Sequence, residues 1–253
     1  MKALVTGASS GIGREMARIL ANTYDELILI GRNKDRLKEL EQELSNKTKV
    51  KTISLDLTMK ENCIKIHKEN KDIDLLINNA GFGDYGKFSE TDLEKEINMI
   101  STNVIACHIL TKLYLKDMMK RNSGHILNVA SIAGFMPGPL MTTYYATKSY
   151  VVRLSEAIRE ELRKEKSKVK ISILCPGPVA TNFETTANVK FQFNGTNSHD
   201  VAEYALNHLH KFYIVPGLAT KISRHLLQIL PGSLTAKIMY KLQSQRTKTN
   251  EKE

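Results

Sequence analysis

The stretch TGASSGIG, residues 6–13, follows the apolar run ALV at 3–5 and precedes the helical pattern REMARILA at 14–21. Its glycines allow a tight turn, a close approach of the backbone to a pyrophosphate, and close packing of the helix on the strand. A helix that begins here also presents free N–H donors and the positive end of its dipole to an anion. Glycine spacing alone is a weak signal. The order of strand, glycine-rich turn and helix nevertheless indicates a dinucleotide-binding unit rather than a generic βα turn.

Short apolar runs with turn residues at their ends recur along the chain after this unit. They are LILI at 27–30, VKTISL at 50–55, DLLIN at 74–78, HILNVAS at 125–131 and KISILCP at 170–176. Helical patterns lie between the runs, at 13–22, 34–45, 91–121 and 144–165. This alternation predicts a parallel sheet covered by helices on both faces. Right-handed crossovers then give a Rossmann-type doubly wound α/β fold with three α/β/α layers, whose ligand crevice lies beyond the carboxyl ends of the strands.

No linker, low-complexity block or internal repeat divides the 253 residues. We therefore expect one catalytic domain, residues 1–217, with a helical extension, residues 218–253. The N-terminus has no signal-peptide pattern, and no run approaches the roughly 18 apolar residues of a membrane-spanning helix. The three cysteines, Cys63, Cys107 and Cys175, form no CxxC pair, which fits a reducing compartment and predicts no metal site. We expect a cytoplasmic protein.

The formal net charge of +10 is unevenly distributed. Residues 218–253 hold seven Lys or Arg against two acids, so half of the surplus lies in the last 36 residues. Charges elsewhere are mixed, as in RNKDRLKELEQELSNK at 32–47, which is typical of a solvated helix face. We therefore expect no nucleic-acid partner.

The residues just after the second apolar run indicate which nicotinamide cofactor binds. An acidic side chain there usually holds a free ribose 2′-hydroxyl, whereas a nearby arginine accommodates a 2′-phosphate. In this chain Gly31 stands at the strand end, Arg32 follows and Lys34 is close by. A guanidinium can bind a phosphate with two hydrogen bonds, so we expect NADP(H) in preference to NAD(H). The alternative is that Arg32 is only a solvated loop residue.

Polar residues also follow the third and fourth runs. Asp56, in LDLT at 55–58, is placed where its side chain can meet the adenine edge. NNAG at 78–81 brings amide side chains and a small residue toward the cofactor, although asparagines here are equally good turn formers.

The fifth run ends in VASIAG, where Ser131 is placed to direct its hydroxyl into the crevice. Thirteen residues later YYATK, residues 144–148, opens a helix with Lys148 four residues after Tyr144 and hence on the same face. A phenol of pKa about 10 is a poor acid–base catalyst at neutral pH, but a nearby ammonium favours the phenolate and lowers that pKa. Tyr145 lies three residues from Lys148, so helix spacing alone does not choose between the two phenols.

Together these motifs resemble the short-chain dehydrogenase/reductase family over about residues 1–215. In family order they are TGxxxGxG at 6–13, NNAG at 78–81, the serine at 131, YxxxK at 144–148 and PGPVAT at 176–181. The family places the catalytic serine thirteen residues before the tyrosine, which selects Tyr144. IGRN at 30–33, the long charged helix and the basic C-terminal extension are similar to the bacterial branch often labelled DltE-like.

The resemblance implies hydride transfer between a nicotinamide cofactor and a carbonyl or secondary alcohol. Tyr144 is then the general acid, Ser131 hydrogen-bonds the same substrate oxygen, and Lys148 lowers the tyrosine pKa and holds the nicotinamide ribose. Asn103 is implied to link Lys148 to solvent through a water. The implied cofactor-binding residues, besides Tyr144 and Lys148, are Gly7, Ser9, Ser10, Gly11, Ile12, Gly13, Arg32, Asp56, Leu57, Asn79, Ala80, Gly81, Pro176, Gly177, Val179 and Thr181.

The substrate end is less clearly marked. Residues 182–199 are a candidate lid, with Phe183, Phe191 and Phe193 either as apolar walls or packed on the body. Two apolar helical stripes are predicted beyond Gly217; they are Leu226, Leu227 and Leu230, and then Ile238, Met239 and Leu242. We expect these stripes to cover the substrate cleft or a partner subunit, which favours an apolar ketone as substrate. The alternative is a weak peripheral contact with an anionic membrane surface.

By the same resemblance we expect a homodimer or homotetramer formed through the helices at 91–121 and 144–165. Two other functions compete with a reductase. An NAD-linked alcohol dehydrogenase is disfavoured by Arg32, and a nucleotide-binding protein without turnover is disfavoured by the intact set of four catalytic residues.

Overall fold

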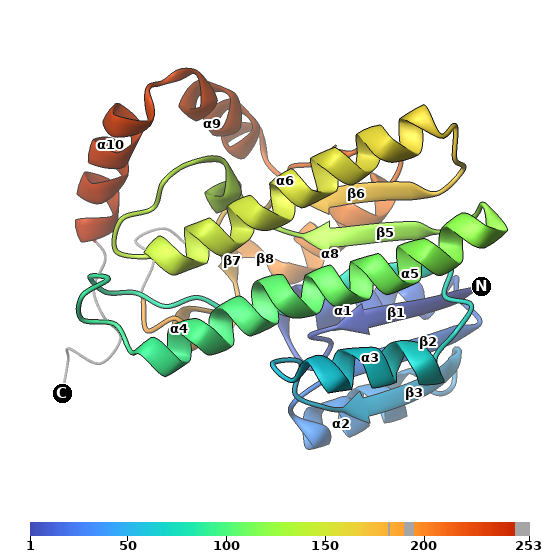
Figure 1. Cartoon of the computed structure of the whole chain (residues 1–253). Coiled ribbons are helices and arrows are strands. Elements are labelled where there is room, and N and C mark those ends of the chain that lie inside the picture. The colour runs from blue at the N-terminus through green and yellow to red at the C-terminus, as the bar shows by residue number, and fades with distance from the viewer. Residues whose placement is uncertain (182, 190–194, 246–253) are drawn as a thin grey trace.

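The computed structural model describes residues 1–181, 183–189 and 195–245, except for the side chains of 184, 185 and 225–228. Seven parallel strands form one sheet in the order β3-β2-β1-β4-β5-β6-β9 (Figure 1). The strands are β1 Lys2–Thr6, β2 Glu26–Gly31, β3 Lys49–Ser54, β4 Leu75–Asn78, β5 His125–Val129, β6 Lys170–Leu174 and β9 Tyr213–Ile214. The predicted doubly wound α/β fold is confirmed.

Helices cover both faces of this sheet (Figure 1). On one face lie α1 Gly11–Leu20, α2 Lys34–Leu44 and α8 Ser198–Asn207; on the other lie α3 Lys60–Glu69, α5 Cys107–Arg121 and α6 Thr142–Lys164. Successive residues of a strand point to opposite faces. In β1, accordingly, Ala3 and Val5 pack in the core under α1, whereas Leu4 packs in the core under α3 and α5. Because both faces are buried, the strands read as continuous apolar runs.

The long helix predicted at 91–121 consists of three consecutive segments. These are α4 Leu93–Ile100, the π-helical turn η1 Ser101–Ala106 and α5. The Asp92 side chain caps its start by accepting a hydrogen bond from the amide of Lys95, and Asn122, in the left-handed region at φ 51°, ends it. Single π-helical turns inside α-helices are frequent at functional sites, and this one carries Asn103.

Several elements are absent from the sequence-based prediction. They are α3, α8, the two-residue strand β9 and a small two-stranded sheet of β7 Val179–Ala180 and β8 Thr196–Asn197. The strands predicted at 125–131 and 170–176 end earlier, at Val129 and Leu174. Strand β9 lengthens the sheet beyond the six predicted strands because its residues pair with Ile173 and Leu174 of β6.

The remaining helices gather at the end of the molecule toward which the strands point (Figure 1). They are the 3-10 turn η2 Ile132–Phe135, α7 Phe183–Thr186, α9 Leu218–Ile229 and α10 Gly232–Ser244. Within the described part of the chain, no helix combines the length and the apolar character needed to cross a membrane. The segments least marked in the sequence thus stand beside the carboxyl ends of the strands, where a doubly wound fold places its ligand.

Candidate active site

The glycine-rich turn between β1 and α1 is held open by its backbone. Gly7 has φ +67°, and a Cβ there would lie 2.8 Å from Asn79 Nδ2. Asn79 Nδ2 donates to the carbonyls of Thr6 and Gly7, at 3.0 and 3.2 Å, which ties the loop after β4 to this turn. Ser10 makes no side-chain cap on α1 and the first turn of the helix holds no acid. The first amides of α1 are therefore left to bind an anion that enters the cavity beside them.

Two arginines border the same cavity after β2. Arg32 and Arg36 are exposed and line it together with Asn33, whose side chain accepts a hydrogen bond from the Arg36 amide. A Cβ at Gly31 would lie 3.1 Å from Ser9 Oγ, so a larger residue at the strand end would require the Ser9 side chain to shift. Asp56 also borders the cavity, and its carboxylate accepts from the amide of Thr58 at 2.9 Å.

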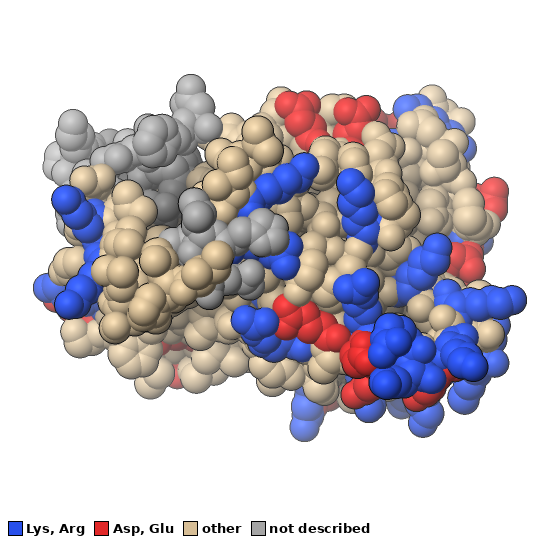
Figure 2. All heavy atoms as spheres, turned by 90° about the horizontal axis from the view of Figure 1, so that it is seen from above, with Lys and Arg blue, Asp and Glu red and all other residues tan. Residues whose placement is uncertain are grey.

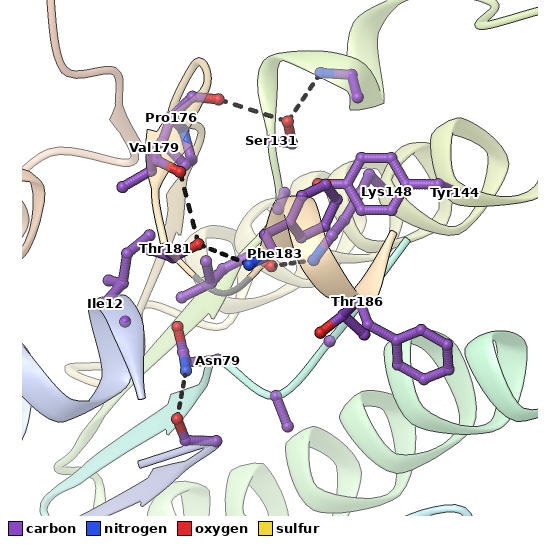
Figure 3. Close-up of a pocket in the computed structure, with 18 of the residues that line it drawn as sticks. Ile12, Asn79, Ser131, Tyr144, Lys148, Pro176, Val179, Thr181, Phe183 and Thr186 are labelled. Carbon is purple, nitrogen blue, oxygen red and sulfur yellow. Dashed lines mark hydrogen bonds between the residues drawn. The ribbon is translucent and has the colours of Figure 1, made fainter. Parts of the chain in front are cut away.

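Ser131, Tyr144 and Lys148 meet beyond the carboxyl end of β5 (Figure 3). Ser131 Oγ accepts a hydrogen bond from the Ala133 amide at 3.1 Å and donates to the Pro176 carbonyl at 3.4 Å. Lys148 is buried, and its Nζ donates to the Val129 carbonyl at 2.9 Å. The Lys148 Nζ lies 5.8 Å from the centre of the Tyr144 ring. The three side chains thus border one cavity, as the spacing of the motifs predicts.

The electrostatics of this group differ from the sequence-based expectation. Burial raises the pKa of the Tyr144 phenol above its ordinary value. The hydrogen bond between Tyr144 and Ser131 lowers this pKa, but by less than burial raises it. Burial also lowers the pKa of the Lys148 ammonium to about 8. The expectation of a lowered Tyr144 pKa is thus contradicted in its net direction, because loss of solvation is the largest influence on this phenol. The effect of Lys148 on the phenol stays a prediction.

Asn103, in the π-helical turn η1, positions backbone rather than lining the cavity. Its Oδ1 accepts from the Phe82 amide at 3.0 Å, and its Nδ2 donates to the Phe82 carbonyl at 2.9 Å and to Thr147 Oγ1 at 3.0 Å. A Cβ on Gly81 would lie 2.9 Å from Asn103 Oδ1 and 3.3 Å from Lys148 Nζ. Asn103 thus joins the loop after β4 to α6 next to Lys148.

Tyr145 has a different environment from Tyr144. Its hydroxyl accepts a hydrogen bond from Gln243 Nε2 of α10 at 2.8 Å. Its ring packs over Gly138, where a Cβ would lie 2.1 Å from the ring, and stands edge-on to the Tyr144 ring with centroids 6.0 Å apart. Tyr145 also borders the cavity, but it serves as an attachment point for the C-terminal helix.

The far end of the cavity has an apolar wall. The Phe183 ring lies 5.1 Å from the Tyr144 ring and packs on Gly83, where a Cβ would be 2.7 Å away. The wall is completed by four more side chains, Met136, Met141, Met239 and Leu242. The whole cavity, with its polar and apolar ends, has a volume of about 780 Å³, which is in the range of small-molecule and cofactor sites.

All the residues predicted for the site line this cavity except Gly13 and Asn103. Gly13 lies beneath it, where a Cβ would be 2.4 Å from Asn79 Nδ2. The prediction missed Arg36, although its place four residues after Arg32, in the first turn of α2, could have suggested it. It also missed the cavity-lining residues of α9, which are Ala219, Thr220 and Ser223. Two residues of the predicted lid, Phe191 and Phe193, lie outside the described residues. The structure also does not describe the side chains of Leu226 and Leu227, which belong to the first predicted stripe. Leu230 and Ile238 are exposed, and among the stripe residues whose side chains the structure describes, Met239 and Leu242 line the cavity.

A sequence model of the short chain dehydrogenase family matches residues 1–190 of the chain. The protein belongs to the short-chain dehydrogenase family. It is therefore an NAD(P)-dependent oxidoreductase built on the Rossmann-type fold.

Two curated relatives of this short-chain dehydrogenase differ in what is known of them. An uncharacterized oxidoreductase of Staphylococcus epidermidis is 33% identical over 210 residues, which cover 81% of this chain and 90% of the relative. A very-long-chain 3-oxoacyl-CoA reductase of Bos taurus is 37% identical over 187 residues, which cover 71% of this chain and 59% of that protein.

Two solved structures of similar fold carry different cofactors. A short-chain dehydrogenase of Sphingobium yanoikuyae in complex with NADPH is 27% identical, with a TM-score of 0.80 over 90% of this chain and 95% of the other. A short-chain dehydrogenase/reductase of Burkholderia phymatum in complex with NAD is 25% identical, with a TM-score of 0.81 over 89% and 92%. Similarity alone therefore does not choose between the two cofactors.

Proposed function

We propose that this short-chain dehydrogenase uses NADP(H) and works as a reductase of apolar ketones, with Tyr144 as the general acid. The observation that carries the proposal is the continuity of one cavity. It joins the glycine-rich turn, the arginines after β2, the Ser131–Tyr144–Lys148 group and the apolar wall.

The chain around β2 favours a cofactor with a 2′-phosphate. Arg32 and Arg36 offer two guanidinium groups at the cavity rim, and each can pair with a phosphate. Gly31 occupies the strand end where an acid would select a free 2′-hydroxyl, and the Ser9 side chain packs close to it. NAD is the competing cofactor, because the similar Burkholderia phymatum structure is a complex with NAD.

The roles of the catalytic side chains follow from where each is fixed. When bound, the reduced nicotinamide supplies the hydride. Tyr144 donates its proton to the carbonyl oxygen of the ketone, and Ser131 Oγ hydrogen-bonds the same oxygen. Donors aimed at a developing oxyanion are usually the largest electrostatic contribution to such a reaction. Because burial raises the Tyr144 pKa, the phenol keeps its proton at neutral pH, which suits a proton donor in reduction.

Lys148 and Asn103 support this proton donor. Lys148 is fixed by the Val129 carbonyl beside Gly81, where its ammonium would hold the nicotinamide ribose and compensate charge on Tyr144. Asn103 fixes the Phe82 backbone and Thr147 around the lysine. Its role in a water-mediated proton relay remains part of the proposal.

The substrate class is inferred from the apolar wall. Phe183, Met141 and Met239 stand beside Tyr144 in one cluster of apolar side chains, and burying such side chains against a ligand is favourable in proportion to the apolar area removed from water. The bovine relative is named for a very-long-chain acyl substrate, which agrees with an apolar ligand. We infer a lipophilic ketone, such as a long-chain, sterol-like or aromatic one, rather than a sugar.

The test is a panel of carbonyl compounds assayed with NADPH and with NADH. We expect kcat/KM to be higher with NADPH and to rise from small polar ketones to lipophilic ones of similar reactivity. Activity confined to small polar ketones would refute the substrate class, and equal use of both cofactors would refute the preference for NADPH. Turnover of none of the compounds, with normal NADPH binding, would favour a nucleotide-binding protein without turnover.

The surface of the long helices supports an oligomer. Leu93, Ile97 and Ile100 are exposed on α4, Ile105 on η1 and Tyr150 on α6. An exposed apolar surface of this kind commonly marks a contact between subunits, and we propose a homodimer or homotetramer formed there. Membership of the DltE-like branch stays a prediction from the sequence.

A further inference from the structure

Helix α10 is attached to the body along one narrow stripe. Thr235, Met239 and Gln243 are buried at four-residue intervals. Gln243 makes two hydrogen bonds to the body: its side-chain Nε2 donates to Tyr145 Oη at 2.8 Å, and its backbone carbonyl accepts from Tyr85 Oη at 2.9 Å. This attachment fixes which face of α10 turns outward. The outward face carries an exposed apolar row at the same interval, Leu234, Ile238 and Leu242.

Helix α9 is fixed in the same way. The Arg224 guanidinium stacks on the rings of Tyr213 and Phe135, at 3.6 and 4.9 Å from their centroids, which turns that side of α9 toward the body. On the opposite side Leu218 and Ile229 are 73% and 80% exposed, and Ile222 lies on the same face at 51%. Large apolar side chains exposed to this degree on two successive helices mark an interaction surface rather than isolated surface residues.

The charges around these apolar rows have a single sign. The chain contains no Asp or Glu between Glu203 and Glu251. Lys237 and Lys241 form an exposed row directly beside the apolar row of α10. On α9 the exposed Lys221 places its ammonium over the Tyr204 ring of α8. Figure 2, which shows the molecule from above, has uncharged side chains with basic ones beside them among the described atoms of this end. A partner for this surface must be apolar and negatively charged.

We propose that the outer face of α9 and α10 binds an anionic lipid bilayer as a peripheral contact. Apolar residues beside lysines on a helix face are what an interfacial contact requires, the apolar row entering the headgroup boundary and the lysines pairing with acidic lipids. A second copy of the chain fits less well, because an isologous contact would bring the same lysines together with no acid in 218–245 to pair with them.

The surface borders the cavity that holds Tyr144. Leu242 belongs to the exposed row and also lines the cavity, and Thr220 and Ser223 line it from the inner side of α9. Docking would therefore bring the cavity to the lipid surface, where lipophilic ketones concentrate. This consequence for substrate supply rests on the proposed function, whereas lipid binding itself does not.

The experiment is flotation of the full-length protein with vesicles of pure phosphatidylcholine and of phosphatidylcholine with 30% phosphatidylglycerol. We expect binding to the anionic vesicles only, weakened by salt. The variant Lys237→Glu/Lys241→Glu should bind at least about 30-fold less, since each basic residue near an anionic surface contributes about 1 kcal/mol. Ile238→Gln should also lower binding by severalfold.

Matched controls keep the test specific. Lys116→Glu/Lys120→Glu makes the same charge change at the same spacing on α5, and Ile64→Gln replaces an isoleucine of α3 that is as exposed as Ile238; both should float as the wild type does. Equal binding to neutral vesicles, absence of binding, or equal losses in the controls would overturn the proposal. So would a change from oligomer to monomer in Lys237→Glu/Lys241→Glu, because this face would then join two copies.

The proposed function and the lipid contact can fail separately. Tyr144→Phe should float as the wild type does while losing turnover. Normal reduction of soluble lipophilic ketones without flotation would overturn only the lipid contact. Flotation by a protein that reduces no ketone would overturn only the reductase.

Discussion

The two ends of the cavity are built by different means. At the cofactor end, backbone atoms and short side chains form the surface: Gly7 in the left-handed region, the uncapped start of α1, and Asn79 bound to the carbonyls of Thr6 and Gly7. At the opposite end, where we propose that the ketone binds and which we call the ketone end, the surface consists of large apolar side chains from segments far apart in the sequence, such as Met141, Phe183 and Met239. We therefore expect the first end to tolerate few substitutions and the second to change its shape when its side chains are exchanged.

This difference decides where chemistry and specificity lie. The proposed proton donor, Tyr144, stands where the two ends meet, beside both Lys148 and Phe183. Changes at this junction should remove the reaction itself. Changes at the cofactor end should alter which nucleotide binds, and changes at the ketone end should alter only the choice of substrate.

The largest expected effect is at the junction. Tyr144→Phe removes the proton donor but keeps the ring against Phe183, so kcat for ketone reduction should fall by about 10²- to 10⁴-fold, while NADPH binding stays within about twofold. Tyr145→Phe should keep most activity, because that hydroxyl bonds Gln243 rather than the reacting group. Steady-state kinetics and a fluorescence titration with NADPH measure both. The reverse order of losses would overturn the assignment of the acid.

The second-largest effect is expected at the cofactor end, on the preference between NADPH and NADH. Arg32→Ala/Arg36→Ala removes two charge-assisted contacts to the proposed 2′-phosphate, so KM for NADPH should rise by about 10- to 100-fold, and KM for NADH should change by less than about twofold. Arg153→Ala, which breaks an exposed ion pair with Glu156 on α6, is the control. Equal losses with NADPH and NADH would show that the arginines do not read the 2′-phosphate.

The same contrast explains how much of the molecule the sequence predicts. The cofactor end is set by local rules, since a left-handed turn needs glycine and a parallel strand buried on both faces is a continuous apolar run, so six strands and most contact residues are predictable. Strand β9 has two residues and exists only because β6 is beside it. Helix α3 buries Cys63, Ile66 and His67 at helical spacing, so its signal is present but weak among charged residues.

The ketone end depends on packing between distant segments. Ile238, Met239 and Leu242 look alike in the sequence, yet Met239 is buried, Leu242 borders the cavity and Ile238 is exposed. Which of the three side chains turns inward depends on Gln243, whose hydrogen bonds with Tyr145 and Tyr85 fix the rotation of α10 about its axis. The direction of the Tyr144 pKa shift is likewise set by burial in the folded protein, which the spacing of tyrosine and lysine does not reveal.

A smaller, pH-dependent effect is expected at the junction. Tyr144 keeps its proton through the neutral range, whereas burial lowers the Lys148 pKa to about 8; the ammonium is present below that pH and is lost as the pH rises through it. We expect kcat/KM for reduction to be level near neutral pH and to fall, by up to about tenfold per unit, above about pH 8. In Lys148→Arg, which stays charged, this alkaline limb should move upward. An unchanged limb would assign it to another group.

The smallest expected effect is at the ketone end. Met239→Ala removes a buried side chain of the apolar wall, so KM for a lipophilic ketone should rise by about three- to tenfold, corresponding to part of the 1.5–3 kcal/mol of a fully buried apolar side chain. KM for a small polar ketone and for NADPH should hardly change. Met118→Ala, a fully buried methionine of the core between α5 and the sheet, is the matched control: it should lower the free energy of unfolding by about 2–5 kcal/mol without altering the preference between the two ketones. If Met239→Ala shifts both ketones equally, α10 stabilises the fold but does not select the substrate, and the two ends of the cavity differ less than their composition indicates.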